Sequence, residues 1–202
     1  MISPNEAFVT AVEAAVARIE KTTDAEIVVV TASKSGVYRD VSLIGAAIAS
    51  LLLLALIIVA PVDLHPLGVL IELAVAFPVF TWMLGHPAFT RRATSQARQE
   101  AQVQTAAAAE FLQEAIHGTP NRTGVLIYIS LLEHRVVILG DFGVDALVPR
   151  GEWSAATERW KFDDTAGFCR YLESFGELLA KRVPANDTSD HFDLPNAPRI
   201  RQ

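Results

Sequence analysis

Two long apolar stretches lie next to each other in the first half of this chain, at residues 41–60 and 67–84. Each is about 20 residues long, the length at which an α-helix crosses a hydrocarbon core of roughly 30 Å. The first stretch contains only Ser42 and Ser50 as polar side chains, which is too few for the water-facing side of a soluble helix. The sequence therefore predicts two transmembrane helices, 41–60 and 67–84, joined as a hairpin.

A secretory signal peptide does not fit this pattern. The first apolar stretch begins about forty residues into the chain, behind an amphipathic segment that carries acidic side chains. A signal peptide instead places its apolar region close to the N-terminus. We therefore expect the hairpin to stay in the mature protein as a membrane anchor.

The charges that flank the hairpin predict its orientation. Lys34 and Arg39 precede the first stretch, and the turn between the two stretches has no lysine or arginine. Three arginines follow the second stretch, at Arg91, Arg92 and Arg98. Because basic residues stay on the cytosolic side, both flanks are predicted to be cytosolic. The three arginines are then predicted to lie near lipid head groups.

Composition limits the choice of partners. Hydrophobic residues make up 51% of the chain, the mean hydropathy is +0.30 and the formal net charge is −6. Because the part outside the hairpin is acidic, nucleic acid is not an expected partner. The expected partners are the lipid bilayer and other membrane proteins. The single cysteine, Cys169, excludes an intramolecular disulfide, and its helical context favours a buried structural thiol over a reactive one.

The polar part of the chain reads as alternating helices and strands. Ser3 is predicted to cap a first helix whose apolar positions recur at helical spacing. The elements predicted after it are a central strand at 26–31, a helix at 96–117 ended by Gly118, strands at 124–130 and 135–140, and a helix at 164–182. Residues 184–202 are predicted to form an extended C-terminal tail.

This order defines one domain that the hairpin interrupts. A strand, a crossover helix and a second strand predict a parallel pair, and the four-residue connection to the third strand predicts an antiparallel pair. The predicted class is α/β, with a small mixed sheet between helices. The cytosolic domain would be discontinuous, consisting of residues 1–36 and 90–183.

Three segments resemble the TPM domain family. They are Ala25-Glu26-Ile27-Val28-Val29-Val30, then 122–130, then the run 133–144 that ends in Gly140-Asp141-Phe142-Gly143-Val144. The family includes thylakoid-lumen proteins described as weak acid phosphatases, an animal membrane protein that assists a receptor, and many bacterial membrane proteins. The resemblance implies an α/β/α sandwich.

The inserted hairpin sets this chain apart from the commoner family layout, in which an exported domain is followed by a membrane helix. It points to a bacterial subgroup of the family. The expected location is the bacterial inner (cytoplasmic) membrane, with both termini and the soluble domain in the cytosol.

Asp141 and Asp145 are the candidate metal ligands. By resemblance to relatives described as binding divalent metal, this pair is a candidate site for Ca²⁺ or Mg²⁺. Two carboxylates alone make a poor site for either ion, and the alternative is that Asp141 caps a turn while Asp145 faces solvent. The predicted topology should also gather six polar residues at the strand ends, namely Asp24, Glu26, Glu133, His134, Asp141 and Asp145.

Glu72 is the notable residue of the hairpin, because an ionisable group inside a membrane span suggests a function. It reaches the outer interface, is protonated against the first helix, or bonds a polar group of a partner. The first span also has a face of small residues, Gly45, Ala46, Ala49 and Ser50, against which another helix can close.

Two functions of different class remain. The first is a non-catalytic interaction or assembly module for membrane proteins, anchored by the hairpin. The second is a weak metal-dependent acid phosphatase, a phosphomonoesterase with Asp141 holding the ion. The sequence favours the first, because it contains no glycine-rich phosphate loop and no cysteine nucleophile with a basic cradle.

Overall fold

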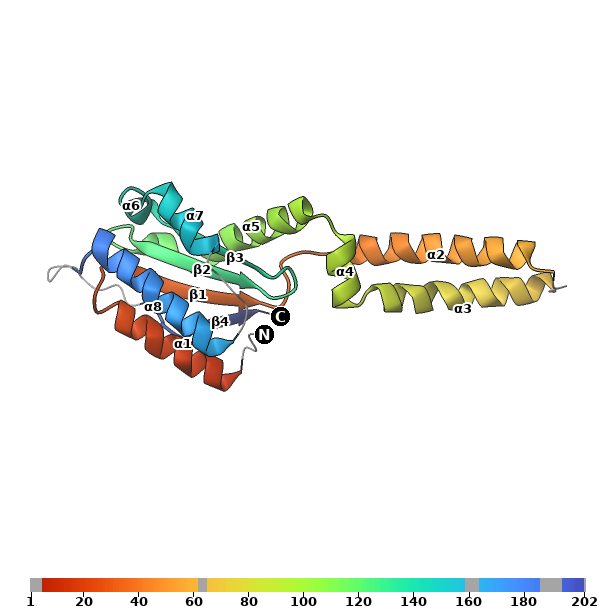
Figure 1. Cartoon of the computed structure of the whole chain (residues 1–202), viewed down its shortest axis with the longest axis horizontal. Coiled ribbons are helices and arrows are strands. Elements are labelled where there is room, and N and C mark those ends of the chain that lie inside the picture. The colour runs from red at the N-terminus through yellow and green to blue at the C-terminus, as the bar shows by residue number, and fades with distance from the viewer. Residues whose placement is uncertain (1–4, 62–64, 159–163, 186–193, 202) are drawn as a thin grey trace. The chain divides into compact units, whose positions relative to one another are not determined.

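The structure is a computed structural model that describes residues 5–61, 65–158, 164–185 and 194–201. The chain divides into two compact units (Figure 1). The first unit consists of residues 1–35 and 100–202, and the second of residues 36–99. The second unit is therefore an insertion in the first.

The first unit contains a four-stranded mixed sheet with the strand order β3-β2-β1-β4. Its strands are β1 Glu26–Ala32, β2 Gly124–Ser130, β3 Arg135–Gly140 and β4 Arg199–Arg201. β1 is parallel to β2 and to β4, whereas β2 and β3 are antiparallel. The predicted parallel pair, the predicted antiparallel hairpin and the central position of β1 are confirmed.

Helices cover both faces of this sheet. α1 Glu6–Ile19 and α8 Thr165–Arg182 pack side by side on one face, and α5 Gln96–Gln113 packs on the other (Figure 1). Alternate residues of β1 separate the two cores, because Ile27 and Val29 face α1 and α8 while Val28 and Val30 face α5. The predicted arrangement of a small mixed sheet between helices is confirmed.

The sequence did not predict β4, which lies at the end of the segment expected to be a tail. β4 has only three residues, and two of them are arginines, so it lacks the apolar alternation that marks a strand. Its arginines pair with the last turn of α5 and the residue that follows it: Arg201 Nη2 lies 3.1 Å from Glu110 Oε2, and Arg199 Nε lies 2.8 Å from Glu114 Oε2. Tertiary ion pairs therefore hold this strand at the sheet edge.

Two predicted helix ends were wrong. Asn5, not Ser3, caps α1, because its extended backbone lets its side chain accept a hydrogen bond of 2.9 Å from the Phe8 amide. α5 ends at Gln113, before Gly118, and Ala115 adopts the left-handed conformation with φ of 52°. The chain leaves the helix there so that Ile116, which is fully buried, can pack closely over Gly124.

Three short helices complete the first unit. A 3-10 turn, η1 Ile116–Gly118, precedes β2, and α6 Phe142–Asp145 follows β3 directly. α7 Arg150–Glu158 then packs against β3. The helical spacing of Trp153, Thr157 and Trp160 predicts that they share one helix face, but Trp160 lies outside the described residues.

The second unit is a helical hairpin. α2 Arg39–Val59 and α3 Pro66–Leu84 pack against each other as antiparallel neighbours, and α4 Pro87–Ala93 follows. The helices approach closely at Gly45, where an added Cβ would lie 2.9 Å from Leu84 Cδ1. Ala46 is fully buried. The predicted small-residue face of the first helix therefore lies in the contact with α3.

The outer surface of the hairpin is apolar. Only 11% of the apolar stretch of α2 and none of that of α3 is buried in the protein. Large apolar side chains are exposed to solvent, among them Leu52, which is 67% exposed, and Val59, which is 82% exposed. Both helices are long and apolar enough to cross a membrane. A core helix of a soluble domain would be buried instead, so this exposure indicates membrane association.

Candidate functional site

Asp141 lies at the junction between β3 and α6 and is held by Arg122. The guanidinium makes two hydrogen bonds with its carboxylate, 2.7 Å from Nε to Oδ2 and 2.8 Å from Nη2 to Oδ1. Oδ1 also accepts a 2.7 Å bond from the Phe142 amide. Asp141 is therefore the N-cap of α6 and the partner of a bidentate arginine.

The local backbone brings this pair together. Arg122 has a left-handed φ of 56° in the turn before β2. Gly143 packs against the same turn, because an added Cβ would lie 2.4 Å from the Asn121 carbonyl oxygen. The side chain of Asp141 is only 4% exposed, whereas that of Arg122 is 56% exposed. Hydrogen bonding from Arg122 lowers the pKa of Asp141 below its usual value, although burial opposes the shift.

The geometry around Asp141 does not resemble a metal site. Both carboxylate oxygens accept hydrogen bonds from Arg122, and a cation there would have to displace the guanidinium. Asp145 ends α6 and lies close to Gly140, where an added Cβ would be 2.9 Å from its Oδ1. Among the described residues, no three His, Cys, Asp or Glu side chains group closely enough to hold a metal. Two carboxylates supply fewer oxygens than the six or more that Ca²⁺ takes, which gives a metal here little support. A metal held by Asp141 and Asp145 stays a prediction.

The expectation that six polar residues gather at one place was wrong. Glu26 begins β1 beside Gly124, and Gly140 ends β3 beside Val125, so Asp24, Glu26, Asp141 and Asp145 lie at one end of the sheet. Ser130 pairs with Arg135, which places the connecting turn with Glu133 and His134 at the opposite end. The antiparallel direction of β3 causes this separation, because its last residue lies beside the first residues of β2.

The opposite end of the sheet contains a buried polar network that sequence reasoning missed. Glu133 is 4% exposed and accepts a 3.1 Å hydrogen bond from the Ser35 amide, and the Ser130 hydroxyl donates to it as well. The Ser35 hydroxyl bonds Ser130 Oγ at 2.6 Å and lies 3.0 Å from the Tyr128 hydroxyl. Burial raises the pKa of Tyr128.

This network fixes the chain just after β1. A serine three residues beyond a strand gives no sequence signal, because its partners lie about a hundred residues further along the chain. The network satisfies its own donors and acceptors, so it stabilises the sheet end.

A shallow pocket lies between α7 and α8. Glu152, Tyr171 and Ser174 are among its lining side chains. Glu152 is bound to the Arg182 guanidinium, with Nε 3.2 Å from Oε2. A carboxylate neutralised in this way is poorly suited to act as a general base. Cys169 in α8 is half-buried, and burial raises the pKa of its thiol, which fits the predicted structural role.

Among the polar residues predicted in or beside the hairpin, some are exposed without a partner in the described part of the chain and one forms an ion pair. Glu72 is exposed on α3 and makes no ion pair or hydrogen bond with the described part of the chain. Arg91 and Arg92 are exposed on α4. Arg98 differs from them, because its guanidinium binds the Asp40 carboxylate at 2.6 and 2.9 Å.

The fold and these sites define an α/β protein with a mixed four-stranded sheet and an inserted apolar helical hairpin. The structure is similar to the NMR structure of the BA42 protein from the psychrophilic bacterium Bizionia argentinensis, a TPM-like domain protein. The TM-score is 0.55 and the identity 18%, over 97% of this chain and 94% of that chain. At this identity the similarity supports the fold alone. No protein-family model matches the sequence, and no curated protein matches it.

Proposed function

We propose that this chain is a membrane-anchored TPM-like protein of the bacterial inner membrane. It acts as a non-catalytic interaction or assembly module for other membrane proteins, with its α/β unit in the cytosol. The observation that carries this proposal is the hairpin, whose two membrane-length helices expose almost their whole apolar surface. Burying that surface in lipid or against another membrane protein removes it from water.

Glu72 supports an interaction within the membrane. It lies on the exposed side of α3, and Gly68 lies four residues earlier, with nothing within 4 Å of the position that a Cβ would take. Residues four apart share one helix face. A carboxyl group on a lipid-facing surface is costly unless it reaches a polar partner. A helix of another membrane protein that approaches Gly68 could supply the hydrogen-bond donor.

Site-specific photocrosslinking in bacterial membranes tests this proposal. A photoreactive residue at Ile71, which is 58% exposed, should crosslink to other membrane proteins, and Glu72→Leu should remove those crosslinks. The matched control is Leu73, which is half-buried in the hairpin, and it should give few crosslinks to other proteins. Equal crosslinking from both positions would contradict a specific interaction face, and release of the chain by alkaline carbonate would contradict the anchor.

The geometry gives less support to the alternative, a weak metal-dependent acid phosphatase. Its proposed ligand Asp141 is already neutralised by Arg122. If a cation competes for that carboxylate, Arg122→Gln should strengthen Ca²⁺ or Mg²⁺ binding in a calorimetric titration, and Asp141→Asn should abolish it. Absence of binding in both the unmodified protein and Arg122→Gln would remove the basis for a phosphatase.

A further inference from the structure

The end of the hairpin formed by the start of α2, the end of α3 and α4 carries a concentration of arginines. Arg39 is the first residue of α2, and Arg91 and Arg92 lie in the last turn of α4. The turn at the other end of the hairpin, residues 60–66, contains no lysine or arginine. The two ends of the hairpin therefore differ strongly in charge.

A fourth arginine, Arg98 near the start of α5, follows α4 closely in the sequence, but not all four are available to bind a ligand. Arg98 is neutralised by Asp40, donates to the Val37 carbonyl oxygen at 3.2 Å, and lies 5.6 Å over the Tyr38 ring. By contrast, the exposed side chains of Arg39, Arg91 and Arg92 make no ion pair or hydrogen bond within the described parts of the chain. We call these three residues the free arginines.

The backbone that presents Arg91 and Arg92 is held in place. The Thr94 hydroxyl bonds the Thr90 carbonyl oxygen at 2.8 Å, and both threonines are buried. Gln99 Nε2 donates to the carbonyl oxygens of Arg91 and Thr94 at 2.7 and 2.9 Å. α4 and its C-cap residue Thr94 are thereby fixed with both threonines buried, which leaves the side chains of Arg91 and Arg92 on the exposed surface of α4.

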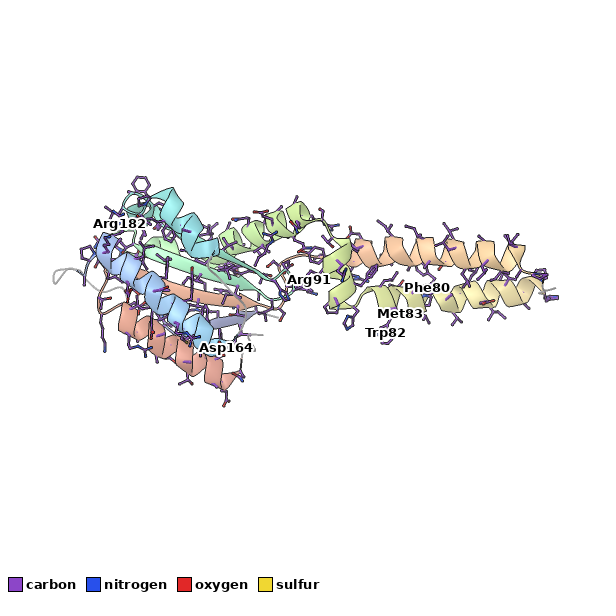
Figure 2. All side chains as sticks on the ribbon, viewed as in Figure 1. Phe80, Trp82, Met83, Arg91, Asp164 and Arg182 are labelled. Carbon is purple, nitrogen blue, oxygen red and sulfur yellow. The ribbon has the colours of Figure 1, made fainter. Side chains whose placement is uncertain are left out.

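Aromatic side chains at the same end indicate the level of the membrane interface. Trp82 is 81% exposed near the end of α3, and Phe89 is 38% exposed on α4. Figure 2 shows Trp82 and Met83 on α3 at the end of the hairpin that also carries Arg91. Tryptophan side chains prefer the boundary between acyl chains and head groups. Arg91 and Arg92 follow Trp82 by nine and ten residues, and Arg39 begins α2 at the end of the helix that contacts Leu84 of α3, so the free arginines lie at head-group level.

We propose that the free arginines bind the phosphate groups of anionic phospholipids at the cytosolic face of the membrane. Guanidinium groups bind phosphate through paired hydrogen bonds. They also neutralise the net negative charge that distinguishes an anionic lipid from a zwitterionic one. This inference rests on the proposed membrane anchor and adds the class of lipid that the anchor selects.

Lipid selectivity can be measured with Trp82 as the reporter. The full chain, with Trp153→Phe and Trp160→Phe so that Trp82 remains the sole tryptophan, is placed in phosphatidylcholine nanodiscs. Brominated phosphatidylglycerol or brominated phosphatidylcholine then replaces part of the lipid, and the ratio of their quenching constants gives the selectivity. We expect a ratio well above 1 that falls at high salt, because the attraction is electrostatic.

Substitutions identify the residues responsible. Each of Arg91→Gln and Arg92→Gln should lower the ratio by up to roughly fivefold, the effect expected of one basic residue near an anionic surface. The matched control is the double variant Asp40→Asn/Arg98→Gln, which removes an arginine without changing the net charge, and its ratio should stay within about twofold of the unmodified protein.

The outcomes separate this inference from the function on which it rests. A ratio near 1 in protein that has entered the nanodiscs would overturn the lipid site alone. So would an equal loss in the control double variant and in Arg91→Gln/Arg92→Gln. Recovery of the chain as soluble protein outside the nanodiscs would overturn both the anchor and the lipid site.

Discussion

Replacing Asp141 with alanine should destabilise the sheet of the first unit. The substitution removes the N-cap of α6, a change that costs about 1 kcal/mol. It also removes the carboxylate that accepts from Arg122 and from the Phe142 amide in a site that is 4% exposed. Lost hydrogen bonds to a buried charged group bring the expected loss in free energy of unfolding to about 2 kcal/mol.

Amide hydrogen exchange of the full chain in detergent micelles measures this loss where it should occur. Under conditions in which exchange reports the opening equilibrium, the amides of β2 and β3 give the free energy of opening directly. The matched control is Glu173→Ala, because Glu173 pairs with Arg18 at the same 2.7 Å but both side chains are about half exposed. An exposed pair is worth little, so the control should change protection by less than about 0.5 kcal/mol.

The effect should also depend on pH in a defined direction. Because the pKa of Asp141 is lowered in the folded protein, its charge contributes stability above its ordinary pKa of about 3.9, and this is lost as the pH falls through the folded value. The difference in protection between the unmodified protein and Asp141→Asn should therefore be largest near neutral pH and shrink below about pH 4. A loss in Asp141→Ala no greater than in the control, or a difference that grows on acidification, would refute this reasoning.

Three further predictions follow from close contacts and burial. Gly45→Val should destabilise the hairpin in detergent by an overpacking cost of about 1–3 kcal/mol, seen as a lower midpoint temperature in circular dichroism. Gly68→Val, where nothing lies within 4 Å of the added Cβ, should leave that midpoint unchanged. Gly143→Ala should reduce exchange protection in β2 by a similar amount because backbone atoms occupy the Cβ position, and Gly118→Ala, with nothing within 4 Å, should leave it unchanged. The raised pKa of Cys169 should make its alkylation at pH 8 slower in the native protein than in guanidinium; equal rates would contradict its burial.

Much of the architecture could be predicted from the sequence because the signals are local. Between its two ends the strand Gly124–Ser130 is an unbroken apolar run of valine, leucine, isoleucine and tyrosine, the strand Arg135–Gly140 follows after four residues, and both have the predicted limits. The helix Thr165–Arg182 begins beside the cap at Asp164, whose Oδ1 accepts from the Gly167 amide at 2.6 Å. The hairpin was equally visible, since about 20 apolar residues with almost no charge have few alternatives to a membrane-length helix.

The sequence could not predict contacts between distant segments. Arg122 and Asp141 meet because the turn before β2 folds against the end of β3. Asp141 therefore became the partner of an arginine as well as a cap, whereas the sequence had left open a turn-capping role and, by family resemblance, a metal ligand. In the same way, Ser35 meets Ser130 and Glu133 across almost a hundred residues.

The sequence by itself determined the class of protein and its inserted apolar hairpin, because hydrophobic length and periodicity are properties of consecutive residues. Only the tertiary structure decided which charges are free. Arg98 and Arg91 are both arginines after the second apolar stretch, yet one is neutralised by Asp40 and the other is exposed. The energy of a charge depends on the groups around it in space, and that arrangement exists only once the chain has folded.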